Sequence, residues 1–264
     1  MRTCLMDEMS WPEARDAAAA GLPALLSIGA TEQHGPHLPL ATDSIIPVGI
    51  ALEAARQIPM VIAPAIRYGA RSRALSGGGE TFPGTLSIRA STLTTSVTEV
   101  LLALRRSGFQ RLVVQNWHFE NAGHLWEACD IAVEAAPDIR VLLLENPMPD
   151  FTDDELHELF PNGFPGWDVE HASIMETSMM LALRPDLVCM DRVVDDEARR
   201  HPSWDVVPAP QDFVPESGVL WHPSEASEEI GHKFLRATAA RLVEAMRAEF
   251  ADLQWTAQAV STHP

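Results

Sequence analysis

Four short apolar runs alternate with longer segments of helical periodicity, and this alternation is the feature that most constrains how the chain can fold. The runs have the length and composition of buried strands and cover residues 24–28, 60–65, 111–115 and 140–144. Apolar spacing with start and stop signals predicts helices over residues 11–20, 43–55, 91–106, 120–135, 172–183 and 227–250. Strands that alternate with helices form a mostly parallel sheet with helices on both faces. The sequence therefore predicts one α/β domain over residues 1–264, with three α/β/α layers and a mostly parallel central sheet.

The composition narrows the classes of partner and compartment. Of the 264 residues, 46% are apolar, so the chain can bury a sizeable core. The 37 acidic and 19 basic residues give a net charge of −18, which disfavours nucleic acid and anionic membranes as partners. No apolar run reaches the ~18–20 residues of a membrane span, and the first residues lack the apolar stretch of a signal peptide. Three widely spaced cysteines predict no disulfide framework, so we expect a cytoplasmic protein.

Two groups of candidate metal ligands follow two of the predicted strands, at residues 32–43 and 118–120. Their mixture of imidazole and carboxylate suits Zn²⁺ or Mn²⁺. Five such side chains are too many for one catalytic ion that must keep a site open, but they fit two ions that share a bridging carboxylate and a bridging water. The pattern predicts two divalent ions, Zn²⁺ and/or Mn²⁺, and metal-assisted hydrolysis. The candidate ligands are Glu32, His34, Asp43, His118 and Glu120.

Each ligand has a plainer interpretation when it is taken alone. Asp43 at the start of a predicted helix would serve as its N-cap, and a lone His34 would be structural. The spacing of Glu32 and His34, however, recurs after another strand in His118 and Glu120. This recurrence favours metal binding by the full set. The remaining histidines near these motifs, which we expect to support the ligands or the structure, are His37 and His124.

A third polar group, Glu170 and His171, follows an aromatic and glycine-rich loop at residues 163–167. A histidine beside a glutamate at the mouth of a site can move protons near neutral pH, which makes this pair a catalytic candidate. The alternative interpretation is a cap on a surface helix. Glu176, a few residues further on, would either support the site or be a polar residue at the edge of the core.

A long glycine-rich segment covers residues 67–88, and such a segment inside a compact domain is usually functional. It contains Ser76, Gly77 and Gly78, but it lacks the lysine of a phosphate-binding loop. We expect the glycines to permit close approach of the backbone to substrate or to a neighbouring subunit. Ser76, Gly77 and Gly78 are therefore candidate substrate contacts.

Longer motifs extend these groups over nearly the whole chain. The most specific is Gly-Ala-Thr-Glu-Gln-His-Gly-Pro-His-Leu-Pro-Leu at residues 29–40, which runs on to Asp43. Together the motifs resemble the creatininase family of metal-dependent amidohydrolases. The other motifs that carry the resemblance lie at residues 76–79, 82–85, 118–121, 166–171 and 176–178, with further similarity over 181–194.

The resemblance implies how the five ligands divide between two ions. One ion would be held by Glu32, Asp43 and His118. The other would be held by His34, Asp43 and Glu120, so that Asp43 bridges. The family also implies an α/β/α fold and a homo-oligomer, specifically a homohexameric ring.

The expected substrate pocket departs from the family pattern at three places. The resemblance matches His171 to the family's proton-handling histidine and Trp167 to a tryptophan that lines the pocket. Trp117 stands where the family has a glycine, and Phe119 stands where it has a tyrosine. A second pocket tryptophan is expected near residues 147–148, and the sequence has none there. All three departures concern substrate rather than metal, so we expect the family's chemistry with an altered substrate preference.

The expected function is hydrolysis of the C–N bond of a small, creatinine-like cyclic amide, with His171, supported by Glu170, passing a proton to the leaving nitrogen. Two rivals within the family are a formamide deformylase and a small-peptide amidase. A third rival is a non-catalytic protein that binds metal for assembly, which would close its coordination sphere and would not need the Glu170–His171 pair. The acidic composition does not favour anionic substrates, although a local pocket can differ.

Overall fold

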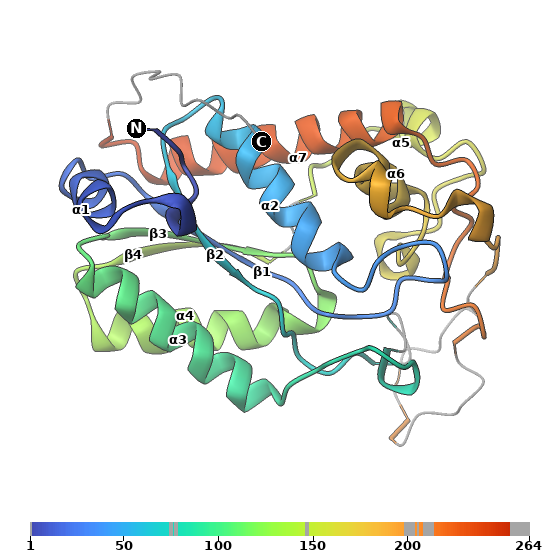
Figure 1. Cartoon of the computed structure of the whole chain (residues 1–264), viewed down its shortest axis with the longest axis horizontal. Helices are drawn as coiled ribbons and strands as arrows, with labels where there is room; N and C mark the ends of the chain where they lie inside the picture. Colours follow the sequence, from blue (N-terminus) through green and yellow to red (C-terminus); the bar gives the residue numbers. More distant parts are fainter. Residues whose placement is uncertain are drawn as a thin grey trace.

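Four parallel strands form one central sheet in the order β2-β1-β3-β4 (Figure 1). The computed structural model describes residues 2–73, 76, 79–145, 148–197, 204, 206–207 and 214–253. Every strand pairing in this sheet is parallel, which confirms the expected parallel sheet. The strands are β1 (Ala24–Ile28), β2 (Val61–Ile66), β3 (Arg111–Asn116) and β4 (Arg140–Leu144).

Helices cover both faces of the sheet, as the sequence predicts (Figure 1). One face carries α2 (Thr42–Ala55), α6 (Ile174–Leu183) and α7 (Glu228–Glu249). The opposite face carries α3 (Ala90–Arg106) and α4 (Ala122–Ala135), which pack against each other. The first helix, α1 (Trp11–Ala19), adds Ala17 and Ala18 to the core on the side of α3 and α4.

The core is divided into two layers by the alternation of side chains along each strand. In β1, Leu25 joins the cluster under α2, α6 and α7, while Leu26 and Ile28 join the cluster under α3 and α4. All five residues of β1 are buried, and this is why the strand reads as a continuous apolar run rather than an alternating one.

Most predicted element boundaries agree with the structure to within one or two residues. The helix predicted over residues 120–135 starts two residues later, because a short 3₁₀ turn (Phe119–Asn121) precedes α4. Asp43 is not an N-cap: the cap of α2 is Ala41, and Asp43 lies in the first turn. The sequence interpretation also missed α5 (Asp153–Leu159), which lies within a proline-rich, acidic stretch of the sequence at residues 146–168 and begins with a capping box between Thr152 and Glu155.

The strand order creates a crevice where the candidate chemistry lies. From β1 the chain moves outward to β2 and then returns across β1 to β3, so the connections after β1 and β3 leave in opposite directions. Ligands of open α/β sheets bind at such a switch point, outside the carboxyl ends of the strands. Both predicted metal motifs follow β1 and β3 directly. Among the described helices, none combines the length and the apolar character needed to cross a lipid bilayer.

Candidate metal centre

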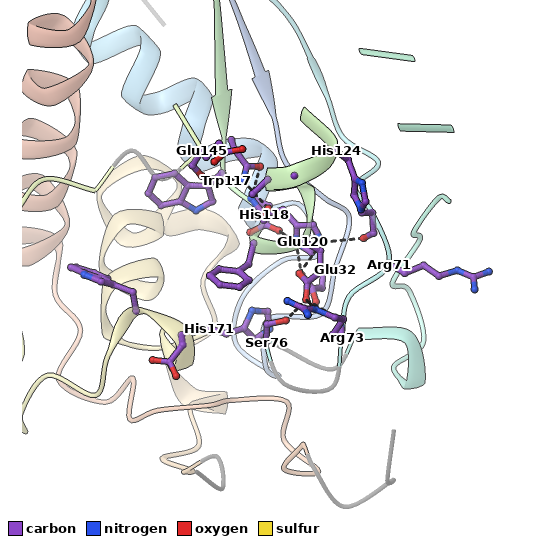
Figure 2. Close-up of a pocket in the computed structure, with 18 of the residues that line it drawn as sticks. Glu32, Arg71, Arg73, Ser76, Trp117, His118, Glu120, His124, Glu145 and His171 are labelled. Atoms are coloured by element: carbon purple, nitrogen blue, oxygen red, sulfur yellow. Dashed lines mark hydrogen bonds and ion pairs between the residues drawn. The ribbon is translucent and has the colours of Figure 1, made fainter. Parts of the chain in front are cut away.

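Two loops at the carboxyl edge of the sheet bring the candidate ligands together. β1 and β3 are neighbours, with Ile28 paired to Asn116, so their following loops leave the sheet side by side. The loop after β1 folds back to the start of α2, and the loop after β3 enters α4. From these segments come Glu32, His34, Asp43, His118 and Glu120, and Figure 2 shows three of them around one cavity.

Two glycines allow this close packing. A Cβ atom at Gly29 would lie 2.0 Å from the backbone oxygen of Asp43, so only glycine lets the end of β1 approach the start of α2. A Cβ atom at Gly69 would lie 2.8 Å from Cδ2 of His118. The loops after β1 and β2 can therefore lie against the ligand-bearing segments without displacing them.

Asp43 lies between the two histidines, with one carboxylate oxygen toward each. Its Oδ1 is 3.1 Å from Nε2 of His34, and its Oδ2 is 3.3 Å from Nδ1 of His118. Glu32 Oε2 lies 3.1 Å from the same Nδ1 of His118. On the other side, Glu176 Oε2 lies 3.6 Å from Nε2 of His34. Two of the three candidate ligand groups among the described residues thus share the carboxylate of Asp43, and the third combines Glu32, His34 and His171.

These separations fit divalent metal ions. Two ligands at about 2.0–2.1 Å from a tetrahedral ion lie roughly 3.3 Å apart, close to the separations observed here. The Oδ2 atom of Asp43 and the Oε2 atom of Glu120 are buried and accept no hydrogen bond within the described residues. A cation is the partner that would satisfy such oxygens, because a buried charge without a partner is costly. The donor set is therefore suited to divalent cations.

The pKa values of the clustered histidines and carboxylates are shifted in the directions that favour positive charge on the histidines. Burial alone would lower the pKa of His34, but the negative charges of Asp43 and Glu176 raise it well above its ordinary value. The pKa of His118 is likewise raised against the effect of burial, by the carboxylates of Asp43 and Glu32 that face its ring. Burial would raise the pKa of Asp43, and the two histidines hold it below its usual range. In the absence of metal, the carboxylates thus draw protons onto the side chains that would bind it.

Glu120 lies on a different side of His118 from Asp43. Its Oε2 is 3.4 Å from Nε2 of His118, whereas Asp43 and Glu32 face Nδ1. Its Oε1 accepts hydrogen bonds from the backbone of Arg73 (2.9 Å) and from the Ser76 hydroxyl. The structure therefore brings four of the predicted ligands into the two groups around Asp43 and leaves Glu120 at their margin.

His171 is buried beside these ligands and is not a surface cap. The cap of α6 is Ser173, and the His171 ring lies 4.3 Å from the ring of His34, centroid to centroid. Its Nε2 contacts two atoms of Gln33, the backbone oxygen at 2.9 Å and the side-chain nitrogen at 3.0 Å. Burial and the nearby positive charge of His34 lower the pKa of His171 well below its ordinary value, so its imidazole is neutral.

Glu170 and Glu176 both bond to the backbone around the start of α6. Glu170 Oε1 accepts from the nitrogen of Met175 (2.9 Å), and Glu176 Oε2 accepts from the nitrogen of Ala172 (2.7 Å). The other oxygen of Glu170 has no hydrogen-bond partner among the described residues. Burial and the charge of Glu176 raise the pKa of Glu170 to about 8. The expected support of His171 by Glu170 is thus indirect, through the backbone, and Gln33 makes the direct contact.

The ligand cluster opens into a cavity of about 950 Å³. The predicted substrate contacts that line it are Ser76, Trp117, Phe119 and Trp167, together with Met148 from the segment where the family tryptophan was expected. Gly77 and Gly78 lie outside the described residues. His124 also lines the cavity, whereas Nε2 of His37 contacts the hydroxyl of Thr177 at 2.9 Å, and burial lowers the pKa of His37 to about 4.

Sequence reasoning missed several residues of this site. Gln33 stands between two predicted ligands, but its contact with His171 spans 138 positions and has no local signal. Ser72 lies in the glycine-rich segment, and its hydroxyl donates a hydrogen bond to Glu32. The arginines at the rim of the cavity lie in or next to the same segment and are Arg71, Arg73 and Arg89. The length of that segment predicts a functional role, but the sequence alone does not indicate which of its other polar residues reach the site.

The chain is similar to known hydrolases over most of its length. The family model for creatininase, described as creatinine amidohydrolase, matches residues 7–246. The chain is 37% identical to a creatinine amidohydrolase of Pseudomonas putida over 257 residues, covering 94% of this chain and 98% of the relative. It is 31% identical to a mycofactocin precursor peptide peptidase of Mycolicibacterium smegmatis over 223 residues, covering 79% and 78%.

Solved structures of creatininases also match the fold of this chain. A crystal structure of creatinine amidohydrolase superposes with a TM-score of 0.90 at 35% identity, covering 95% of this chain and 99% of that one. A structure named as a zinc–zinc form of a creatininase mutant has a TM-score of 0.89 at 35% identity, covering 95% of this chain and 99% of that one. A structure named as manganese creatininase has a TM-score of 0.89 at 36% identity, covering 94% and 99%. With a family model that matches most of its length and a relative of this identity, the chain belongs to the creatininase family of amidohydrolases.

Proposed function

We propose that this protein uses divalent metal ions to hydrolyse the C–N bond of a small, creatinine-like cyclic amide. The observation that carries the proposal is the position of Asp43, with one oxygen toward His34 and the other toward His118, at the side of an open cavity. Membership of an amidohydrolase family supports the reaction, and the name of the Pseudomonas relative supports the class of substrate.

We propose two ions per chain, Zn²⁺ and/or Mn²⁺. Glu32, Asp43 and His118 would hold one of them. His34 and Asp43 would hold the other, and the family pattern completes that site with Glu120. Glu176 lies nearer to His34 in this structure and is the competing third ligand.

Bound ions would supply Lewis acidity toward a water molecule and toward the amide carbonyl. The chain's own residues would manage the proton. Neutral His171, which lines the cavity, would take a proton from the attacking water and return it to the leaving nitrogen. The water oxygen bonds to the carbonyl carbon, the C–N bond breaks, and the nitrogen leaves with the proton. Glu170 would support this step by tying the segment that carries His171 to α6.

We propose that Trp117, Phe119 and Trp167 contact the substrate, with Ser76, Gly77 and Gly78 on the glycine-rich side. A buried aromatic ring offers ~150–250 Å² of contact surface, so a gained or lost ring changes which substrates fit. For this reason we expect creatinine to be a poor substrate compared with another small cyclic or N-acyl amide.

A small-peptide amidase is the second candidate function. It is favoured by the relatives named as peptide peptidases and by a cavity of about 950 Å³, near the upper end of the usual ~300–1,000 Å³ for ligand sites. A deformylase would use the same centre on a smaller amide. A non-catalytic metal site is disfavoured because structural sites close their coordination sphere, whereas this cluster borders an open cavity.

We also propose a homohexamer in the cytoplasm. Phe119, at the cavity, and Tyr68, on the neighbouring loop, are more than half exposed, which suits contacts with another copy of the chain. All three cysteines are free, which suits a reducing compartment. Light scattering coupled to size-exclusion chromatography measures the oligomeric state.

The decisive experiment combines metal analysis with hydrolysis. We expect two ions per chain and measurable kcat/KM on a panel of creatinine, lactams, hydantoins, cyclic ureides, formamides and dipeptides. Activity should disappear with a chelator and return with Zn²⁺ or Mn²⁺. A metal-loaded protein that cleaves no member of the panel would contradict the enzymatic proposal.

A further inference from the structure

Two arginines stand side by side at the rim of the cavity. The segments after β2 and before α3 meet at a parallel bridge between Ala70 and Ile88, where Ile88 N donates to the oxygen of Gly69 (2.9 Å). Arg71 and Arg89 are the next residue on each segment. Neighbouring bridged segments lie ~4.8 Å apart, so the bridge holds these two positions close together.

Neither arginine is neutralised by the described part of the chain. Arg71 and Arg89 form no salt bridge and no side-chain hydrogen bond there, although acidic residues outnumber basic ones by 37 to 19. Like charges at neighbouring positions destabilise a fold. Both side chains are exposed, so solvent screens much of this repulsion and leaves their charges available to an anion in the cavity.

Arg71 lies on a separate side of the cavity from Trp117. Figure 2 shows Arg71 and His124 on one side of His118 and Glu120, and Trp117 and His171 on the other. Arg73 lies between, with its Nε 3.7 Å from Glu120 Oε1. All of these residues line the same cavity. The first residues of α3 and α4, Ala90 and Ala122, line it too, and the positive ends of these helices add to the field.

We propose that Arg71 and Arg89 form a subsite for a carboxylate carried by the substrate, so that the physiological substrate is an anionic amide rather than a neutral ring. This inference rests on the proposed hydrolase function and specifies its substrate class. The amide lies at the metal cluster, and its carboxylate-bearing arm extends past Arg73 toward Arg71 and Arg89. The net charge of −18 opposes anion binding at long range, and carboxylates also line the cavity, but Arg71, Arg73 and Arg89 gather positive charge on this arm of it.

The test compares two ligands of nearly equal size. Hydantoin-5-acetate carries a carboxylate, and hydantoin-5-acetamide replaces it with a neutral amide. Binding of each to the metal-loaded protein is measured by isothermal titration calorimetry, for the wild type, Arg71→Gln, Arg89→Gln and the double variant. Arg236→Gln, which removes an exposed charge from α7 outside the cavity, is the matched control.

We expect the wild type to bind the acid roughly tenfold more tightly than the amide, since a charge-assisted contact is stronger than a neutral one. Each single variant should reduce this preference by roughly three- to tenfold, and Arg236→Gln should leave it unchanged. Equal binding of acid and amide by the wild type, no binding of either, or dissociation of the oligomer in the arginine variants would each overturn the subsite.

Turnover of the same two compounds separates the two proposals. Faster hydrolysis of the acid than of the amide, with a lower KM for the acid, supports both the hydrolase function and the anion subsite. The KM for the acid should then rise in the double variant while the metal content is unchanged. Equal hydrolysis of acid and amide would leave the hydrolase function standing and overturn the anionic substrate class. Selective binding of the acid without hydrolysis of either compound would support the subsite and contradict the hydrolase function.

Discussion

Gln33 contacts one ring nitrogen of His171 twice, through its backbone oxygen and through its side-chain nitrogen. Nε2 of an imidazole has either a proton or a lone pair, so only one of these contacts is a hydrogen bond at a time. A protonated Nε2 donates to the carbonyl oxygen, and a deprotonated Nε2 accepts from the amide. Gln33 can therefore hold the ring in place in both states.

The amide of Gln33 is itself fixed. Its Oε1 accepts from the nitrogen of Gly35 (2.9 Å), and its Nε2 donates to the oxygen of Gly218 (3.0 Å). A Cβ atom at Gly218 would lie 2.0 Å from Gln33 Oε1, and Gly218 has φ +74°, so glycine is required there on two grounds.

Gln33→Leu should lower kcat by roughly 10- to 100-fold, because a misplaced proton-transfer group slows the reaction without abolishing it. His171→Ala should lower kcat further, by ~10²–10⁴. Steady-state kinetics with metal analysis of each variant measures this, and metal content and KM should change little. Gln57→Leu, at an exposed position after α2, is the control. An unchanged kcat in Gln33→Leu would remove Gln33 as a positioning residue.

Asp43→Ala should lose more metal than any other single ligand variant, because its carboxylate faces both histidines. Elemental analysis of the purified variants gives the number of ions per chain, with the exposed Asp130→Ala on α4 as a control. Retention of two ions and full activity by Asp43→Ala would exclude Asp43 from the centre.

Glu120→Gln and Glu176→Gln distinguish the two possible third ligands for the ion at His34. We expect Glu120→Gln to reduce the content from two ions to one, and Glu176→Gln to retain both. The Oε2 atom of Glu120 is buried without a hydrogen-bond partner in the described chain, while Glu176 Oε2 already accepts from Ala172. The reverse result would assign the ligand role to Glu176.

Removal of metal should destabilise the protein. Saturation at ~100 times Kd contributes about 2.7 kcal/mol of stability, and each kcal/mol shifts the Tm of a domain this large by roughly 2–4 °C. A chelator should therefore lower the Tm by roughly 5–10 °C in calorimetry. Asp43→Ala should respond much less to the chelator, and an equal response would place the stabilising metal elsewhere.

Trp117→Gly restores the residue that the family pattern has at this position. If the Trp117 ring, which lines the cavity, blocks creatinine, the variant should show a higher kcat/KM for creatinine and a lower one for the preferred amide. The ratio of the two values is the measurement. A wild-type enzyme that already prefers creatinine clearly would show that the three sequence departures leave the pocket effectively unchanged.

Local patterns were sufficient to predict the sheet and the group formed by Glu32, His34, Asp43 and His118. Strand runs such as residues 111–115 and the two-residue spacing of Glu32 and His34 are determined by neighbours in the sequence, and parallel pairing brings their ends together. The role of Gln33 could not be predicted, because it depends on a contact with a loop 138 positions away. Helix α5 was missed because its capping box lies within a proline-rich stretch.

The strand order assigns different tasks to different loops. Connections after the central strands β1 and β3 carry Glu32, His34, Asp43 and His118, whereas the loop after β2 carries Arg71 and Arg73 and the long segment after β4 carries Met148 and His171. The loop after β2 and the residues around Met148 can change in sequence without disturbing β1–β3 pairing, which holds the loops with these four ligands in register. Substitutions at these two places in the cavity wall can thus change substrate preference while the ligand-bearing loops are inherited intact.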